Sequence, residues 1–541
     1  MSIHSPLSPH QRDPSSLTRQ RFDALIIGGG INGAGIARDL ALRGVRVALV
    51  EKGDFASGTS SASTKLVHGG LRYLERFDFR LVFESCRERR ILQTIAPHLV
   101  RPLPFFIPVY KGDPRSLLTI RAGMTLYDLL ALFRNTGRHT ILSAGEAIRS
   151  EPALQGEGLV GAARYWDCRM DDARLCLENI LAAAGAGAEV FNYMTLTSLV
   201  KRGGKVCGAR LRDGIDGQER EVEATVIINA TGPWLDRLCA LDGDDAAKLR
   251  TTRGTHILVP RINCGDEALY LTAGRDDRLF FVIPWGELSL IGTTDVDDRR
   301  DPDDLGPTEE DIAYLLGEAK RHLRTPELQR DDIVSSFAGL RPLVAEEESK
   351  ATRTSREHRL FTSSSGLLSV GGGKYTTYRA VAEEVSHRVM GLLGRPRGPS
   401  LTGSTPLPGG ATGDFSRFLA TQVPLWRSSC DLPRERLEGL ADLYGSQTPR
   451  LLAMAAAEPD LLEPIVAGSP LLALQVAYAV DFERARTPED ILRRRTPLAL
   501  LPGRGLTELP AVAGFMASRL GIDRDRSQEW ENSYRKRYLT P

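Results

Sequence analysis

The stretch FDALIIGGGINGAGIARDLALRGVRVALVEK, which begins at Phe22, limits the possible folds of this chain more than any other feature. Its apolar run Ala24–Ile27 predicts a buried parallel strand. Ile31–Leu42 continues with helical apolar spacing, and Gly44 ends that helix. Val45–Val50 predicts a second buried strand. These elements make a complete βαβ unit, so the sequence indicates an α/β domain with a parallel sheet.

Between the first strand and the helix, Gly28, Gly30 and Gly33 form the pattern GxGxxG. Such glycines allow a tight turn and a close approach of the backbone to a pyrophosphate, which the helix N-terminus attracts. Glu51 lies 18 residues after Gly33, where a carboxylate accepts both hydroxyls of an adenosine ribose. The unit therefore predicts a dinucleotide site, and the alternative is a glycine-rich turn in an ordinary α/β domain.

A second segment favours FAD over NAD. ATVIINATGPW (Ala224–Trp234) reads as a β-branched strand that runs into an Ala-Thr-Gly turn, and in many flavoproteins such a turn closes over the same cofactor. The sequence has no second GxGxxG for a separate NAD domain. We therefore expect FAD, with a substrate rather than NADH as the electron donor.

The stretch SSASTKLVHGGLRYLE (Ser60–Glu75) is expected to run along the cofactor from the ribose toward the flavin ring. Gly69 and Gly70 would let the backbone pass close to the flat ring system. Hydroxyls for the phosphate and ribitol oxygens would come from Thr59, Ser60, Ser61 and Ser63. The alternative is a serine-rich surface loop followed by the start of a helix.

Eight strings occur in order along the chain: GGGINGAGIARDLALRG, TSSASTKLVHGGLRYLE, DDARL, NATGPW, FVIPW, IGTTDV, RDDIV and GGGKYTTYR. Together they resemble the FAD-dependent sn-glycerol-3-phosphate dehydrogenases of the respiratory type, over about Phe22 to Tyr538. The resemblance implies oxidation of sn-glycerol 3-phosphate to dihydroxyacetone phosphate. A hydride would pass from the substrate C2 to the flavin N5, and the electrons would go on to a membrane quinone.

The fold class that we expect is α/β + α. An FAD-binding βαβ domain of the glycine-oxidase-like flavoprotein type would carry an antiparallel-sheet substrate domain and a C-terminal helical cap domain. The expected ranges are a flexible tail at 1–20, the oxidoreductase domain at 21–395 and the helical domain at 410–541. Within the oxidoreductase domain, the FAD segments are about 21–80, 165–240 and 335–393, and the substrate- or membrane-facing segments are about 81–164 and 241–334.

The motifs and the resemblance together give a set of expected cofactor-binding residues. They are Gly28, Gly30, Asn32, Gly33, Glu51, Lys52, Thr59, Ser60, Ser61, His68, Gly69, Gly70, Leu71, Ala230, Gly232, Gly373, Lys374 and Thr376. One position departs from the family pattern, because Gly371 stands where a larger residue, often Phe, is expected. That departure places the local packing beside the flavin in doubt.

A phosphate dianion in a pocket needs several cations or a helix terminus. By the resemblance, the residues around the substrate are Arg72, Tyr73, His256, Arg341, Arg356, Lys374 and Thr376. His256, Arg341 and Lys374 are the expected catalytic residues. His256 is the first choice for the base that takes the C2 hydroxyl proton, and Arg341 and Lys374 could instead stabilise an alkoxide. The alternatives are solvated surface arginines and a core histidine.

PRSLLTIRAGMTLYDLLALFRNTGRH, within which we single out 114–138, mixes apolar residues with arginines. An amphipathic helix of this kind can lie in the headgroup layer, and its cations favour an anionic leaflet. The alternative is a core helix of the substrate domain. The resemblance implies a cytoplasmic enzyme, bound peripherally to the inner face of the cytoplasmic membrane. The oligomeric state stays open, with a homodimer as one candidate.

The net charge and the cysteine pattern argue against some classes of partner and site. The formal net charge of +1 provides no general attraction for nucleic acid. The seven cysteines are scattered without a CxxC, so we expect neither a metal site nor a disulfide framework.

Three other functions remain open beside the dehydrogenase. They are a glycerol-3-phosphate oxidase that uses O2, an amine or amino-acid oxidase of the same fold, and a non-enzymatic flavin-binding protein. The C-terminal string VDFERARTPEDILRRRT resembles the family's cap segment, but the sequence alone assigns it no role.

Overall fold

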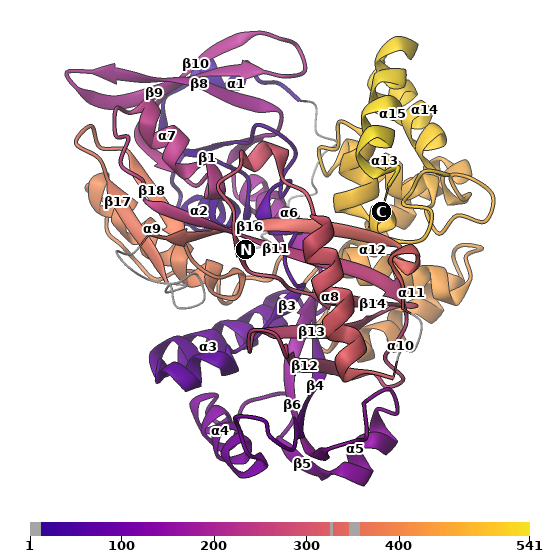
Figure 1. Ribbon diagram of the computed structural model, residues 1–541. Helices are drawn as coiled ribbons and strands as arrows, with labels where there is room; N and C mark the ends of the chain where they lie inside the picture. The colour runs from indigo at the N-terminus through magenta and orange to yellow at the C-terminus, as the bar shows by residue number, and fades with distance from the viewer. Residues whose placement is uncertain (1–11, 325–327, 346–356, 541) are drawn as a thin grey trace.

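The computed structural model describes residues 12–324, 328–345 and 357–540 (Figure 1). One of its two sheets has the strand order β17-β18-β10-β1-β2-β7, with β9 paired to β10 and β8 to β9. The strands of this sheet are β1 (Phe22–Ile27), β2 (Val47–Val50), β7 (Glu189–Phe191), β8 (Met194–Arg202), β9 (Lys205–Asp213), β10 (Glu219–Asn229), β17 (His358–Thr362) and β18 (Leu368–Gly372). The five strands β18, β10, β1, β2 and β7 are mutually parallel, as expected for a sheet built on a βαβ unit.

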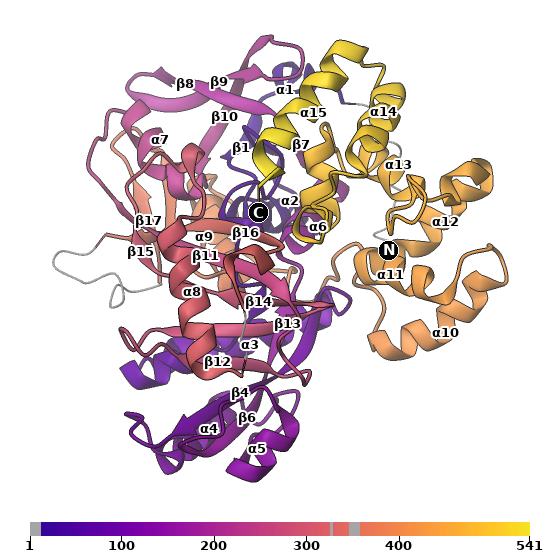
Figure 2. The same cartoon turned by 45° about the vertical axis from the view of Figure 1, so that its right-hand side comes forward.

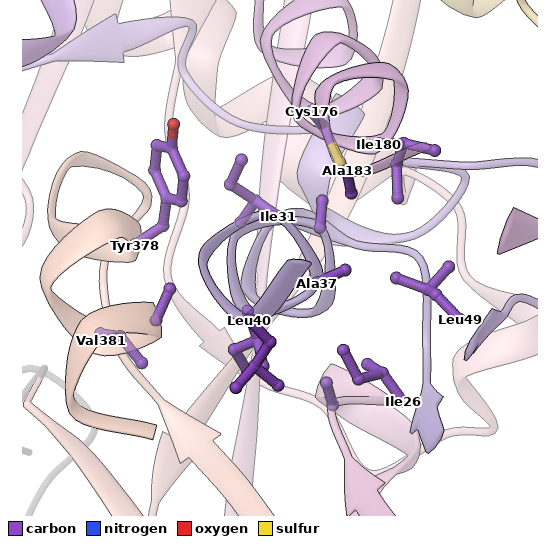
Figure 3. Packing of buried hydrophobic residues seen from close by; sticks show 14 of the residues in the cluster. Ile26, Ile31, Ala37, Leu40, Leu49, Cys176, Ile180, Ala183, Tyr378 and Val381 are labelled. Carbon is purple, nitrogen blue, oxygen red and sulfur yellow. The ribbon is translucent and has the colours of Figure 1, made fainter. Parts of the chain in front are cut away.

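Three helices bury the apolar face of this parallel sheet. They are α2 (Ile31–Leu42), α6 (Asp172–Gly185) and α9 (Tyr378–Leu392). Figure 3 shows α2 at the centre, with Leu40 among side chains of all these elements. Ile26 and Leu49 come from the strands, Ile180 comes from α6 and Val381 comes from α9. The helix is buried on nearly every side, which fixes its N-terminus against the ends of β1 and β2.

The second sheet has the order β15-β11-β14-β13-β12-β4-β6-β3, with β16 paired to β11 and β5 to β6. Its strands are β3 (Leu66–Val67), β4 (Val100–Tyr110), β5 (Thr140–Ser143), β6 (Leu159–Met170), β11 (Leu249–Pro260), β12 (Ala268–Thr272), β13 (Leu279–Trp285), β14 (Leu288–Gly292), β15 (Val296–Asp297) and β16 (Ser335–Val344). The expected antiparallel arrangement holds except between β4 and β12, which are parallel. A long stretch of chain separates those two strands, so no hairpin forces them to be antiparallel.

Two strands lie in a different sheet from the one that the sequence suggests. β3 and β16 fall in the segments 21–80 and 335–393, which we assigned to FAD binding, yet they pair with β6 and β11 of the second sheet. Each of these segments therefore passes from one sheet to the other. A cavity lined by residues of both sheets lies along that passage.

The remaining helices cover the outside of the two sheets or form the C-terminal domain. They are α3 (Phe79–Ile95), α4 (Leu117–Leu130), α5 (Ala144–Ser150), α7 (Leu235–Leu241), α8 (Glu309–His322), α10 (Phe415–Arg427), α11 (Arg434–Tyr444), α12 (Thr448–Ala457), α13 (Ala473–Asp481), α14 (Leu509–Leu520) and α15 (Arg524–Tyr538). Figures 1 and 2 show α10–α15, in orange to yellow, gathered on one side of the sheets. Among the described helices, none is both long and apolar enough to cross a bilayer.

The N-terminal segment differs from the flexible tail that we expected at 1–20. Ser16–Arg19 forms the short helix α1, and the side chain of Leu17 is fully buried. Arg12 donates to Asp213 at 2.6 Å. Leu17, this ion pair and a hydrogen bond from Ser16 Oγ to Glu189 at 3.2 Å hold residues 12–20 against the sheet. Residues 1–11 lie outside the described residues.

Candidate active site

A cavity of about 520 Å³ is lined by residues of both sheets. On the side of the first sheet, the cavity is lined by residues at the carboxyl ends of the four central parallel strands. Each of these residues comes directly after the last residue of its strand. These residues are Gly28 after β1, Glu51 after β2, Ala230 after β10 and Gly373 after β18. The carboxyl ends of parallel strands are where α/β proteins bind their ligands, and the volume is typical of a ligand pocket.

The turn after β1 is built for close backbone approach. Gly28 has a φ of 113°, and a Cβ there would lie 2.5 Å from the carbonyl oxygen of Ala230. A Cβ on Gly33 would overlap the carbonyl oxygen of Gly28, so Gly33 packs behind the turn and does not line the cavity. Gly30 is the N-cap of α2 and contributes no side-chain hydrogen bond. The positive end of α2 thus faces the cavity, as pyrophosphate binding requires, and the N-cap residue itself has no side chain that would cover it.

Glu51 faces the same end of the cavity. Its carboxylate accepts hydrogen bonds from the N–H of Gly29 at 2.7 Å and from the N–H of Gly53 at 2.9 Å. Burial raises the pKa of Glu51, and these two N–H groups oppose the rise. A carboxylate has about four lone-pair positions, so two acceptor positions are left for ribose hydroxyls.

Some hydroxyl groups of the loop after β2 form hydrogen bonds with the protein backbone. Ser60 Oγ accepts from the N–H of Ile31 at 2.9 Å, and Thr59 Oγ1 donates to the carbonyl of Leu340 at 2.6 Å. Both residues line the cavity, whereas Ser61 does not. These hydroxyls therefore fix the loop against α2 and β16 before any ligand is considered.

The glycine pair at 69–70 makes room for aromatic side chains. A Cβ on Gly69 would overlap the hydroxyl of Tyr127, and a Cβ on Gly70 would lie 2.5 Å from the ring of Tyr73. Neither glycine lines the cavity, whereas the neighbouring His68 and Leu71 do. The close contacts that these glycines make in the structure are with Tyr127 and Tyr73, and their approach to the flavin stays a prediction.

His256 lies on β11 in the half of the cavity that faces the second sheet. Its Nε2 is 2.9 Å from Thr64 Oγ1, and its ring stacks on Phe337 with centroids 4.9 Å apart. The ring is 1% exposed, and Nδ1 has no hydrogen-bond partner among the described residues. Burial, followed by the charges of Arg341 and Lys65, lowers the pKa of His256 well below 6.5. The imidazole is therefore neutral at physiological pH.

Arg341 lies on β16, beside His256. Its Nη1 donates to Asp295 Oδ1 at 3.2 Å, and its Nη2 donates to Thr293 Oγ1 at 2.8 Å. The facing strands provide space through two glycines. A Cβ on Gly254 would overlap the guanidinium of Arg341, and a Cβ on Gly292 would overlap the ring of His256.

A second cation, Lys374, approaches the cavity from the turn after β18. Its Nζ lies 3.5 Å from the centroid of the Tyr73 ring and 3.4 Å from Ser85 Oγ. Lys374 is 9% exposed, so the cation–π contact is largely shielded from water. Thr376 Oγ1 accepts from the N–H of His68 at 3.3 Å, which joins this turn to the 68–70 turn.

Most of the expected site residues meet in this cavity. Those that line it are Gly28, Gly30, Asn32, Glu51, Lys52, Thr59, Ser60, His68, Leu71, Tyr73, Ala230, Gly232, His256, Arg341, Gly373, Lys374 and Thr376. Arg72 belongs to the 3-10 turn Leu71–Arg76, and Arg356 lies outside the described residues.

Gly371 does not face the cavity. A Cβ there would lie 3.0 Å from the ring of Phe361 on β17 and 3.2 Å from Leu249. Phe361 thus fills the space that a larger residue at 371 would need. The departure from the family pattern is accommodated outside the cofactor site.

Several residues that shape the site were missed by the sequence analysis. They are Thr64, Asp167, Gly254, Gly292 and Thr293. Asp167 had a usable signal, because it is the single carboxylate in the strand segment GAARYWDCRM. The two glycines had none, since only the strand pairing shows what faces them.

Comparison with known proteins agrees with this geometry. A family model described as FAD dependent oxidoreductase matches residues 23–379, and one described as the C-terminal domain of alpha-glycerophosphate oxidase matches residues 400–527. Glycerol-3-phosphate dehydrogenase of Synechocystis is 38% identical over 531 residues, which cover 95% of this chain and 95% of that protein. The chain belongs to the FAD-dependent glycerol-3-phosphate dehydrogenase family.

Solved structures of related proteins bear out the expected fold. A glycerol-3-phosphate dehydrogenase from Bacillus halodurans, complexed with FAD, has a TM-score of 0.81 and 32% identity, and the match covers 96% of this chain and 95% of that chain. Glycine oxidase from Geobacillus kaustophilus has a TM-score of 0.50 and 20% identity, over 71% of this chain and 98% of that chain, and it shares the fold alone. The glycine-oxidase-like fold and FAD as the cofactor are confirmed for this dehydrogenase family member, and the turn at Gly28, the N-terminus of α2 and Glu51 fit that cofactor.

Proposed function

We propose that this protein oxidises sn-glycerol 3-phosphate to dihydroxyacetone phosphate and passes the electrons to a membrane quinone. The observation that carries the substrate proposal is the pair of cations, Arg341 and Lys374, in the cavity that Gly28 and Glu51 also line. Two cations in one cavity suit a phosphorylated alcohol better than the zwitterion of an amino acid. The dehydrogenase names of the relatives support the same substrate.

FAD supplies the acceptor for the hydride that leaves C2 of the substrate. Around the C2 atom of the substrate, side chains of the protein provide positive charge and accept the hydroxyl proton. Arg341 is oriented by Thr293 and Asp295, so its guanidinium can hold a phosphate oxygen or the developing C2 alkoxide. Lys374 provides a second positive charge from the turn that follows β18.

The neutral state of His256 limits its part in proton transfer. A base whose pKa is well below 6.5 is protonated only transiently at physiological pH. The nearby guanidinium of Arg341 destabilises the imidazolium further. We infer that His256 accepts the C2 hydroxyl proton and passes it on to water, and that Arg341 stabilises the oxygen from which the proton leaves. Thr64 orients the ring through Nε2.

Membrane contact is proposed through the apolar residues near α4. Phe77 is 78% exposed, Leu118 is 75% exposed and Phe133 is 66% exposed. The turn that precedes α3 packs against α4, and Figures 1 and 2 show α3 and α4 at the end of the molecule away from α13–α15. Large exposed side chains of this kind, together with exposed arginines such as Arg121, suit the headgroup layer of the inner face of the cytoplasmic membrane.

The first experiment is anaerobic reduction of the purified holoenzyme. We expect sn-glycerol 3-phosphate to bleach the visible flavin band, while glycerol and glycine, which lack the phosphate, leave it unchanged. A flavin band that glycine bleaches would move the protein to the amine oxidases, and a band that no donor bleaches would indicate a non-enzymatic flavoprotein.

The electron acceptor and the oligomeric state need measurements of their own. Reoxidation of the bleached enzyme by a quinone analogue much faster than by air supports the quinone proposal, whereas rapid release of H2O2 in air indicates an oxidase. Light scattering coupled to size exclusion determines the oligomeric state and tests the homodimer, which is one candidate.

A further inference from the structure

Three consecutive arginines of the C-terminal domain lie buried against the cofactor-binding part of the chain. Arg493, Arg494 and Arg495 end the π-helical turn Asp490–Arg495, in which the N–H of Thr496 donates to the carbonyl of Ile491 at 2.8 Å. All three side chains are buried. The turn packs against α6, and Figure 2 shows the C-terminal helices on that side of the molecule. Such π-helical turns are rare and occur often at functional sites.

Two of these arginines bind one carboxylate in the loop that follows β2. Arg494 Nε donates to Asp54 Oδ2 at 2.7 Å, and Arg495 donates to both oxygens of Asp54, with Nη2 at 2.9 Å from Oδ1. Asp54 is 1% exposed. Burial opposes its ionisation, but the two guanidiniums outweigh burial and lower the pKa of Asp54. The carboxylate is therefore charged and held by the C-terminal domain.

The third arginine holds the other end of the same loop. Arg493 Nη2 donates to the carbonyl oxygen of Ser61 at 2.9 Å, and its guanidinium lies 5.5 Å from the centroid of the Phe337 ring. Within the described residues, Arg493 pairs with no carboxylate. Its contacts are thus directed to the loop and to the ring that stacks on His256.

The loop between the two anchored residues is part of the cofactor cavity. Asp54 and Ser61 bracket the segment 57–60, all of which lines the cavity. Ser60 in that segment accepts from the N–H of Ile31, at the start of the helix whose N-terminus faces the cavity. Displacement of the loop would therefore alter both the wall of the cavity and the end of α2.

We propose that Arg493, Arg494 and Arg495 are positioning residues for FAD, and that the C-terminal domain contributes to cofactor affinity by fixing the loop from Asp54 to Ser61. The arginines do not line the cavity, so they act through the loop. This role concerns cofactor binding and does not depend on which substrate is oxidised. It gives the string DILRRRT a function that sequence patterns do not reveal.

The test compares two arginines of the same domain. Arg493→Met removes the bond to Ser61 without leaving a buried carboxylate unpaired. Arg519→Met is the matched control, because Arg519 pairs with Asp481 at 2.7 Å within the C-terminal domain and does not contact the loop. We expect the Kd of the apoprotein for FAD, measured by quenching of flavin fluorescence, to rise about tenfold in Arg493→Met, which corresponds to loss of one charge-assisted hydrogen bond. Arg493→Lys should recover part of the affinity, and Arg519→Met should leave it unchanged.

A second measurement needs no variant. Because coupling between two sites is reciprocal, FAD binding to the wild-type protein must slow amide hydrogen exchange in residues 490–496 as well as in residues 54–61. Slower exchange in both segments supports the proposal even if Arg493→Met does not fold. An unchanged Kd in Arg493→Met, or FAD protection that is confined to residues 54–61, overturns it.

Discussion

Asp167 accepts a hydrogen bond from the backbone N–H of Gly69, with 3.0 Å between Oδ1 and N. The same oxygen accepts from the hydroxyl of Tyr127 at 2.8 Å and from the guanidinium of Arg89. Tyr127 belongs to α4, so one buried carboxylate joins the helix proposed for membrane contact to the 68–70 turn beside the cofactor cavity.

Asp167→Asn should destabilise the protein strongly, because it leaves the buried guanidinium of Arg89 without its charged partner. Loss of one partner of a buried ion pair costs about 3–5 kcal/mol in free energy of unfolding. Urea denaturation of the holoenzyme measures this loss. Asp266→Asn is the control, since its side chain is 96% exposed in its pair with Arg261 and the change should cost under about 1 kcal/mol. Equal losses in the two variants would contradict the burial argument.

Gly254→Ala should impair catalysis while FAD stays bound. The new methyl group would lie 2.6 Å from Thr293 Oγ1 and overlap Arg341, so the guanidinium must move. We expect kcat/KM for sn-glycerol 3-phosphate to fall at least about tenfold, the size of one misplaced charged contact. Gly439→Ala on α11 is the control, because no atom lies within 4 Å of the added methyl group. Its activity should be unchanged, and loss of the flavin spectrum from purified Gly254→Ala would show that the damage lies in cofactor binding instead.

Because of the lowered pKa of His256, the free energy of unfolding of the protein should decrease in mild acid. The folded pKa is lowered well below the unfolded value of 6.5, so between the two values the unfolded chain binds the extra proton. Stability from this group is complete above pH 6.5 and decreases as the pH falls toward the folded pKa, by at most about 1.4 kcal/mol per pH unit. Urea denaturation at about pH 7.5 and about pH 5.5 measures the slope.

The variant His256→Asn isolates the contribution of this residue to that slope. It should lose less stability than the wild type between the two pH values, because no group at position 256 then titrates. Identical pH dependence in the two proteins would show that folding does not lower the pKa of His256.

Leu129→Glu combined with Phe133→Glu should weaken binding to anionic vesicles. Leu129 is 53% exposed and Phe133 is 66% exposed, so the change adds charge to the proposed membrane surface and leaves the core intact. Vesicle flotation measures the bound fraction. Leu425→Glu on α10 is the control, since Leu425 is similarly exposed but belongs to the C-terminal domain. Unchanged flotation of the double variant would remove α4 from the membrane proposal.

The βαβ unit could be predicted closely because the spacing of its apolar residues and of its glycines is a local property of the sequence. The helix Ile31–Leu42 was expected with those bounds, and the two strands were shifted only slightly, to Phe22–Ile27 and Val47–Val50. The surroundings of Gly69 could not be predicted in the same way. A glycine pair shows that something approaches closely, but only the tertiary structure shows that Tyr127 and Tyr73 do so.

The prediction of the residues around the substrate depended on the family resemblance rather than on residue patterns. Arg341 and His256 are joined by the pairing of β16 with β11, which lie far apart in the sequence. Charge alone could not distinguish them from surface residues, and Gly254 opposite Arg341 has no local signature. The depressed pKa of His256 follows from burial, which a sequence does not record.

The strand order of the first sheet has a consequence for synthesis of the protein. β1 leaves the ribosome long before its neighbour β10, which ends at Asn229, and before β18, beside β10, which ends at Gly372. The last wall of the cavity, Gly373 to Thr376, follows still later. The nascent chain must therefore carry an unfinished sheet edge until Gly372 has been made, and the cavity is not complete before Thr376 has been added.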